Sequence, residues 1–176
     1  ASLRKPLLEL LEYARERKAV IIYLPGFRPE LCSRITRVMP SILENLEFAD
    51  IVMARESDMV KIFGKSTSEA CYDEHISFYC PDFVFVSSNL DINLHTRSEK
   101  LILESRNTMP LNLLGWHASF CAGFIKGMLE NNARHGIGNL DRSALQGITE
   151  LAIACAADSI RTGDNIVSEE FVKTLK

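Results

Sequence analysis

Three short apolar runs, separated by stretches with helical periodicity, constrain the fold of this chain most strongly. The runs are residues 19–24, 49–53 and 82–87. Continuous apolar runs of this length are typical of strands that are covered on both faces. Strands that alternate with helices are joined by right-handed crossovers, which make the strands parallel and place helices on both faces of one sheet. The pattern therefore predicts an α/β fold with a mostly parallel sheet.

The segments around these runs supply the helices and the weaker strands. Apolar spacing of three or four residues predicts helices over residues 5–18, 29–44, 56–63 and 66–79, the last with a capping box at 66–69. Weaker strands at 92–96 and 101–103 are expected to pair with each other, and a polar loop, a helix capped from Ser143 and a short helix at 168–175 follow. No linker or repeat divides residues 1–176, so we expect a single domain.

Composition argues against several classes of function. The net charge of −3, without a basic block, offers no footprint for nucleic acid. No apolar run reaches the ~18 residues of a membrane span and no signal peptide opens the chain, so we expect no membrane partner. Five cysteines without C-x-x-C spacing argue against a disulfide framework and a zinc site, and favour a cytoplasmic protein.

Residues 110–128 form the strongest candidate for a functional element. A short apolar segment ends at Gly115, and a helix follows in which Phe120, Phe124 and Met128 recur every four residues. The first turn of such a helix offers N–H groups to an anion such as phosphate. A buried helix after a turn is the alternative. Two glycines leave one face of this helix open to close packing: Gly123 and Gly127.

This stretch resembles the C-terminal signature of the PfkB (ribokinase-like) carbohydrate kinases, in which a G-A-G-D turn opens a helix that continues as x-F-x-x-G-F. The matching residues are Gly115, Phe120, Gly123 and Phe124. The resemblance implies that Ala118 occupies the position of the family's catalytic aspartate, which takes the proton from the sugar hydroxyl. It also implies that Trp116 and His117 replace small residues of the anion hole that begins at Gly115.

The two replacements allow more than one interpretation. His117 is close enough in sequence to act as a substitute base, although its side chain should leave the helix about 100° from residue 118. Burial as a structural histidine is the alternative. Trp116 either stacks on a ligand or fills the anion site.

Two earlier motifs extend the resemblance toward the N-terminus. Residues 24–29 are similar to the family's D-P-N-x-R-P turn, with Arg28 and both prolines kept. Arg28 either grips an anionic group or pairs with a nearby carboxylate. In the family's N-x-x-E motif, Arg55 falls on the asparagine and Asp58 on the acid that helps to organise Mg²⁺ and phosphate. A surface carboxylate on a short helix is the alternative for Asp58.

A third motif concerns the nucleotide. The family's T-x-G at a nucleotide-binding strand end corresponds to Val86, Ser87 and Ser88. The resemblance therefore assigns nucleotide contacts to Ser87 and Ser88. ATP and Mg²⁺ are the implied cofactors if binding is retained, and a sugar is the implied substrate.

The resemblance covers the whole order of elements and implies a ribokinase-like three-layer sandwich that lacks its N-terminal half. The chain is then either a natural product of this length or a fragment. Structural anchors are kept, whereas positions that would touch substrate, metal or nucleotide have changed. We therefore interpret the chain as a catalytically impaired binding, regulatory or assembly module. The alternatives are an active ATP-dependent sugar kinase, completed by another chain, and an unrelated doubly wound domain with chance matches.

The expected sheet has an exposed edge. In the family topology, the strand at residues 19–24 would lie beside strands of the missing half. An apolar edge without charges or internal prolines invites pairing with another chain. We therefore expect a homodimer, or a second polypeptide, to cover residues 19–24.

Overall fold

The computed structural model describes residues 3–104, 114–161 and 164–175. The chain forms two compact units, of which the first comprises Ala1–Ile102 with Arg134–Asn139 and the second Leu103–Ala133 with Leu140–Lys176. Each unit is described by itself. Among the described residues, no helix is long and apolar enough to cross a membrane.

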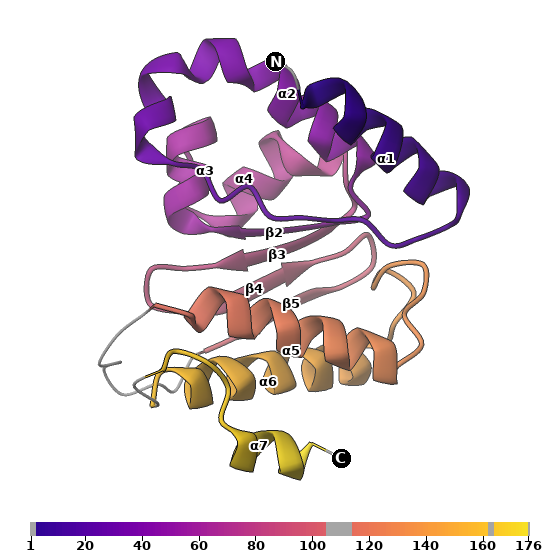
Figure 1. The fold of residues 1–176 in the computed structure, drawn as a ribbon, viewed down its shortest axis with the longest axis vertical. Helices are drawn as coiled ribbons and strands as arrows, with labels where there is room; N and C mark the ends of the chain where they lie inside the picture. Colours follow the sequence, from indigo (N-terminus) through magenta and orange to yellow (C-terminus); the bar gives the residue numbers. More distant parts are fainter. Residues whose placement is uncertain (1–2, 105–113, 162–163, 176) are drawn as a thin grey trace. The chain divides into compact units, whose positions relative to one another are not determined.

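The first unit is built on a five-stranded sheet (Figure 1). The strands lie in the order β1-β2-β3-β4-β5, in which β1 and β2, and β2 and β3, are parallel, whereas β3 and β4 are antiparallel. Their bounds are β1 (Ile22–Tyr23), β2 (Ile51–Arg55), β3 (Asp82–Val86), β4 (Ile92–His95) and β5 (Lys100–Leu103). The predicted strands are thus present, with β2 and β3 buried as expected but β1 only half-buried. The weaker strands at 92–96 and 101–103 are neighbours, as expected.

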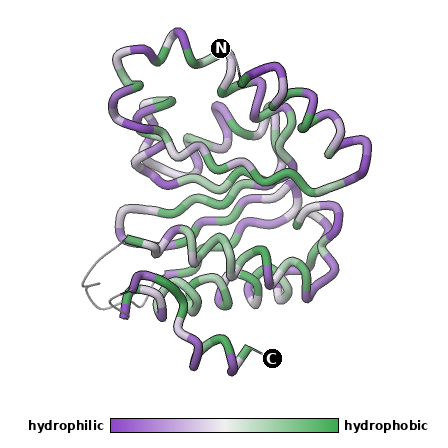
Figure 2. The backbone as a smooth tube through the Cα atoms, in the orientation of Figure 1, coloured by the Kyte–Doolittle hydropathy of each residue, from purple (hydrophilic) through white to green (hydrophobic). Residues whose placement is uncertain are grey.

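Helices pack on the sheet of this unit through one apolar cluster. Figure 2 shows that the central strands, which contribute residues to this cluster, are largely hydrophobic. The cluster joins Val52, Ala54, Phe83 and Phe85 of the strands to buried side chains of the helices that follow each strand. These helices, together with the first helix of the chain, are α1 (Arg4–Glu16), the 3₁₀ helix η1 (Pro29–Arg34), α2 (Ile35–Phe48), α3 (Glu56–Phe63), α4 (Ser68–Glu74) and the 3₁₀ helix η2 (Ile76–Phe78).

Strand β1 is shorter than the predicted strand at residues 19–24. The backbone N–H of Ile21, which lies within the predicted strand, donates to Oδ2 of the Asp50 side chain at 2.7 Å. The Ile21 carbonyl still accepts from the backbone N–H of Asp50 and Ile51. Two residues remain in regular pairing with β2.

Local capping explains the other differences in the first unit. The helix expected at 66–79 runs only to Glu74 and is followed by η2, since the chain turns before Pro81. Its N-cap is Thr67, whose hydroxyl accepts from the Ala70 N–H at 3.3 Å. Gly64 ends α3 in the left-handed conformation, as predicted, with φ of 70°.

The described part of the second unit contains the helices α5, α6 and α7, of which α5 and α6 lie side by side (Figure 1). A Cβ added at Gly123 would lie 2.9 Å from the Cα of Ala152, and one added at Gly127 would lie 3.1 Å from the Cα of Ile148. The predicted close packing against this face is confirmed, and α6 is the helix that approaches. The bounds are α5 (Trp116–Glu130), α6 (Arg142–Ser159) and α7 (Glu169–Thr174).

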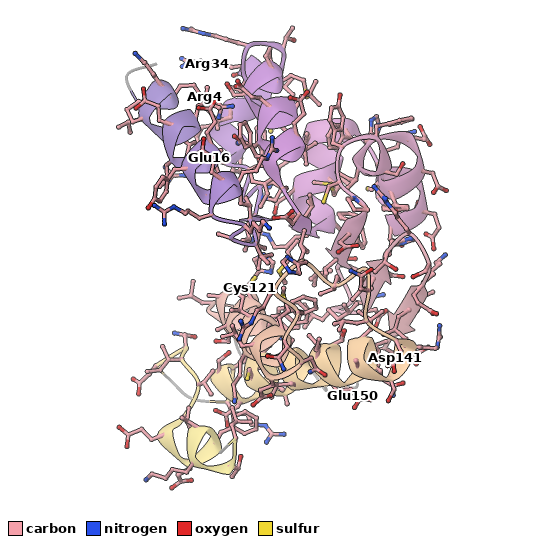
Figure 3. All side chains as sticks on the ribbon, turned by 90° about the vertical axis from the view of Figure 1, so that its right-hand side faces the viewer. Arg4, Glu16, Arg34, Cys121, Asp141 and Glu150 are labelled. Atoms are coloured by element: carbon pink, nitrogen blue, oxygen red, sulfur yellow. The ribbon has the colours of Figure 1, made fainter. Side chains whose placement is uncertain are left out.

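The cap of α6 differs from the prediction. Asp141, labelled in Figure 3, is the N-cap, and its Oδ1 accepts from the Ala144 N–H at 2.8 Å. The expected cap at Ser143 was wrong because an aspartate two residues earlier supplies the acceptor. Helix α7 is capped by Ser168, as its position suggested. The apolar segment expected at 110–113 lies outside the described residues.

Candidate functional site

The sequence-predicted site residues fall into two groups, one in each unit. The first unit holds Arg28, Asp58, Ser87 and Ser88, which follow the carboxyl ends of β1, β2 and β3. These three strands are parallel, so their carboxyl ends share one edge of the sheet, where ligands bind in α/β folds. The second unit holds the four residues around the start of α5: Gly115, Trp116, His117 and Ala118.

Asp58 lies in the first turn of α3 and is buried, with 1% of its surface exposed. Arg55 donates to it through two nitrogens, Nε to Oδ2 at 2.9 Å and Nη2 to Oδ1 at 3.0 Å. The backbone N–H of Phe27 donates to the same Oδ1 at 3.1 Å. The interpretation of Asp58 as a surface carboxylate is therefore wrong, because an arginine one helical turn away and the turn after β1 enclose it.

This enclosure decides whether Asp58 fits the Mg²⁺ that the motif resemblance implies. Mg²⁺ binds accessible carboxylate oxygens and keeps several of its waters. Both oxygens of Asp58 already accept hydrogen bonds, and the bidentate partner is itself a cation whose pKa is raised, first by the hydrogen bond to Asp58. The residues present do not fit the metal. Among the described residues, no group of three or more His, Cys, Asp or Glu side chains could hold a metal ion.

The two serines after β3 lie in the tight turn that leads to β4. The Ser87 hydroxyl accepts from the Asp91 N–H at 3.0 Å. The Ser88 N–H donates to Oε2 of Glu56 at 2.7 Å. The backbone donor that the resemblance offers to a nucleotide therefore already binds a carboxylate of the protein. Sequence reasoning missed Glu56, since nothing local links it to a residue 32 positions away.

Arg28 lies in the turn after β1. It is the exposed N-cap residue of η1, with extended backbone, and its carbonyl accepts from the Leu31 N–H at 3.0 Å. Among the ion pairs between described residues, none involves Arg28. Its neighbour Phe27 holds this turn against Asp58, so Arg28 is positioned at the carboxyl edge.

Gly115 opens α5 with a left-handed backbone, φ of 85°. A Cβ at this position would lie 2.1 Å from the carbonyl oxygen of Asn165. Glycine is therefore required both by the backbone angle and by the close approach of the segment before α7. The Gly115 carbonyl accepts the first helical bond, from the Ser119 N–H at 2.9 Å.

The three residues after Gly115 differ in exposure. Trp116 is 2% exposed and stacks on Phe120, with ring centroids 5.3 Å apart. His117 is half-buried, with Nε2 4.0 Å from the Sγ of Cys121. Ala118 is exposed. A methyl group accepts no proton, so residue 118 offers no general base.

Two cavities of the first unit, both lined by described residues, lie elsewhere. One, of about 270 Å³, has a lining that includes Arg15, Lys18, Asp50 and Arg134 at the amino end of the sheet. Another, of about 320 Å³, has a lining that includes Met39, Phe63, His75 and Phe78 on the helical side. Neither contains a sequence-predicted site residue, and we base the candidate site on the hydrogen-bond geometry at the carboxyl edge.

No protein-family model matches this sequence, and no curated protein matches it. The chain is nevertheless similar in structure to several sugar kinases. It aligns with fructokinase from Vibrio cholerae O395, in its fructose-, ADP- and calcium-bound form, with a TM-score of 0.78 and 14% identity, over 98% of this chain and 56% of that chain. For aminoimidazole riboside kinase from Salmonella enterica the values are 0.75 and 15%, over 95% and 55%.

A third structure agrees with these two. The ATP-bound fructokinase from Xylella fastidiosa aligns with a TM-score of 0.75 and 12% identity, over 95% of this chain and 54% of that chain. This chain thus spans just over half the length of the structures it matches. At these identities the likeness concerns the fold, and it establishes a ribokinase-like α/β fold for this chain.

Proposed function

We propose that the chain is a PfkB carbohydrate-kinase-like domain that has lost catalysis and serves as a binding, regulatory or assembly module. The ribokinase-like fold supports the kinase ancestry. The resemblance of the motifs at Arg28, Asp58 and Gly115 supports the same ancestry at the level of residues.

The observation that carries the loss of catalysis is the exposed methyl of Ala118 in the first turn of α5. Phosphoryl transfer needs a group that orients the attacking hydroxyl and accepts its proton, together with charge compensation at the transferred phosphate. Loss of a general base typically lowers the rate by about 10²- to 10⁴-fold. In this domain the position of the base holds no titratable group.

The carboxyl edge of the first unit supports the same proposal. Asp58 is bonded to Arg55, and the Ser88 N–H is bonded to Glu56. The groups that the resemblance assigns to metal and nucleotide therefore already form hydrogen bonds with other residues of this chain. Any remaining ligand is a sugar or a nucleotide of the kind bound in the structures of similar fold, held more weakly than in an active kinase.

We place the domain in the cytoplasm. All five cysteines are free thiols, and burial raises the pKa of Cys71 and Cys80 to about 12. Thiols of this kind are unreactive and persist in a reducing compartment.

The catalytic part of the proposal is tested with the purified chain, ATP, and either fructose or aminoimidazole riboside. We expect no phosphorylated sugar, by mass spectrometry, under conditions in which a fructokinase of the same fold turns over. Ala118→Asp should not restore turnover, because Asp58 and Ser88 stay engaged with Arg55 and Glu56. Transfer by the unmodified chain that disappears in His117→Ala would favour the alternative, an active kinase.

Assembly is proposed at the edge of the sheet, where β1 has β2 as its only neighbour in the described sheet. Helix α1, which precedes β1 in the chain, has no buried residue, and Leu10 in it is 61% exposed. An unpaired edge strand and exposed leucines each favour association. We propose that a second copy, or else a separate polypeptide, covers this edge.

Sedimentation at micromolar concentration measures this association. We expect a dimer that Ile21→Lys dissociates, whereas Val172→Lys, at a residue of α7 that is 47% exposed, leaves it intact. A monomer whose residues 19–24 exchange their amide protons quickly would refute the proposal for a second copy.

A further inference from the structure

The Arg55 guanidinium lies against Asp58, the residue to which the resemblance assigns a role in organising a divalent cation. A guanidinium carries five N–H donors, and the bonds from Nε and Nη2 to Asp58 use two of them, which leaves three. The Arg55 side chain is 43% exposed, whereas Asp58 is 1% exposed. The Asp58 carboxylate is therefore shielded from solvent, whereas the Arg55 side chain that binds it is still partly exposed.

The position of Arg55 is held from several sides. Arg55 is the last residue of β2 and the extended N-cap of α3. Asp58 binds two nitrogens of the fork, and the Phe27 N–H shares one oxygen of the same carboxylate. A guanidinium bonded in this bidentate way keeps a defined direction, which a flexible lysine ammonium would not.

Arg55 compensates Asp58 at this edge without a metal. The two form a neutral pair, beside which Arg28 carries an exposed positive charge, and Glu56 and Asp91 carry negative charges on the β3 side. A divalent cation would have to displace the guanidinium and expose a carboxylate that has no water-accessible surface to spare. A phosphate group, in contrast, needs only the outward donors of Arg55, and competes with Glu56 for the Ser88 N–H.

We propose that Arg55 acts as a built-in cation in place of Mg²⁺, so that this edge contacts nucleotide phosphate without a divalent metal. This inference rests on the proposed function for the class of its ligand. It goes further, because it concerns the metal requirement of the site rather than the loss of catalysis.

Direct titration with Mn²⁺, followed by electron paramagnetic resonance, tests the metal part without any substrate. We expect no stoichiometric Mn²⁺ site in the unmodified chain, and the same thermal midpoint in EDTA and in Mg²⁺. A single Mn²⁺ site that is lost in Asp58→Asn would overturn the inference. Phosphoryl transfer to a sugar would instead overturn the proposed function, so the two failures are distinguishable.

Calorimetric titration with ATP tests the phosphate part. We expect the affinity to change less than about threefold between EDTA and Mg²⁺. The double variant Arg55→Ala/Asp58→Asn, which leaves no buried charge unpaired, should lower the affinity about tenfold, as expected for loss of a charge-assisted contact. Arg37→Ala, an exposed arginine of α2, is the matched control and should bind as the unmodified chain does.

Two outcomes would contradict the phosphate part. One is ATP binding that requires Mg²⁺ and is lost in Asp58→Asn alone, which would make Asp58 a metal ligand. The other is an equal affinity in the double variant and in the Arg37→Ala control, which would show that Arg55 does not contact the phosphate.

Discussion

Two buried aspartates stand at opposite ends of the sheet in the first unit and are compensated in different ways. Asp58, after the carboxyl end of β2, is 1% exposed and is paired with the Arg55 guanidinium. Asp82, the first residue of β3, is 3% exposed, and its Oδ2 accepts from the backbone N–H groups of Ile137 and Gly138, each at 3.0 Å. Oδ1 of Asp82 has no hydrogen-bond partner in the part of the chain that the structure describes.

The difference shows what a full charge contributes that backbone dipoles do not. Burial raises the pKa of Asp82, and the two backbone hydrogen bonds offset this only in part. At the other end of the sheet, the charge of Asp58 is compensated by its ion pair with Arg55. The end at Asp82 is closed by a loop, residues 134–139, whose backbone donors converge on Asp82.

The largest effect is expected when the ion pair between Arg55 and Asp58 is broken. Arg55→Ala leaves a buried carboxylate without its cation, and such losses destabilise proteins strongly. We expect the free energy of unfolding, from urea titration, to fall by ~3 kcal/mol, at the low end of the range for buried pairs because the Arg55 side chain is 43% exposed.

Two variants sharpen this result. Arg37→Ala removes an exposed arginine and should change stability by less than about 0.5 kcal/mol. Arg55→Ala/Asp58→Asn should recover part of the loss, because no charge is left buried. A loss of under about 1 kcal/mol in Arg55→Ala would mean that water replaces the guanidinium, and the contrast between the two aspartates would disappear.

A smaller effect is expected at the unpaired end, and it depends on pH. The folded-state pKa of Asp82 is raised above its ordinary value of 3.8. Between these two pKa values the folded state holds a proton that the unfolded state has lost, so the stability that Asp82 contributes falls as pH rises through this window. Asp82→Asn does not titrate. The unfolding free energy of Asp82→Asn, relative to the unmodified chain, should therefore rise from about pH 4 to about pH 7.

The matched substitution is Asp82→Ala, which removes the acceptor of two backbone N–H groups. It should lower stability by ~1–3 kcal/mol at low pH, since those donors stay buried without a partner, and by less as pH rises and the charge on Asp82 becomes costly. A pH-independent difference between Asp82→Asn and the unmodified chain would contradict the raised pKa and would make the two ends of the sheet alike.

Much of the fold could be predicted because its determinants are local. The apolar runs of β2 and β3, the stop at Gly64 and the apolar spacing of α5 each act within one or two turns of chain. Arg55 and Asp58 also lie only three residues apart, so their positions in one motif were visible. The resemblance identified them correctly as neighbours at a strand end, but not as partners.

The rest depends on residues that the chain brings together from a distance. Phe27 reaches Asp58 across 31 positions, and Ile137 reaches Asp82 across 55. Whether Asp58 would be a surface carboxylate, a metal ligand or half of an ion pair was therefore open in the sequence. The same holds for the shortened β1, because a side chain 29 residues away takes its backbone donor.

Helical and strand periodicity, caps and turn glycines are properties of short segments, and for this reason the amino-acid sequence alone determined the order of elements and the α/β class. Burial is a property of the assembled sheet. Only the tertiary structure decided which carboxylates lose their water and which donors replace it, because a desolvated charge takes its partner from whatever segment the fold brings within hydrogen-bonding distance.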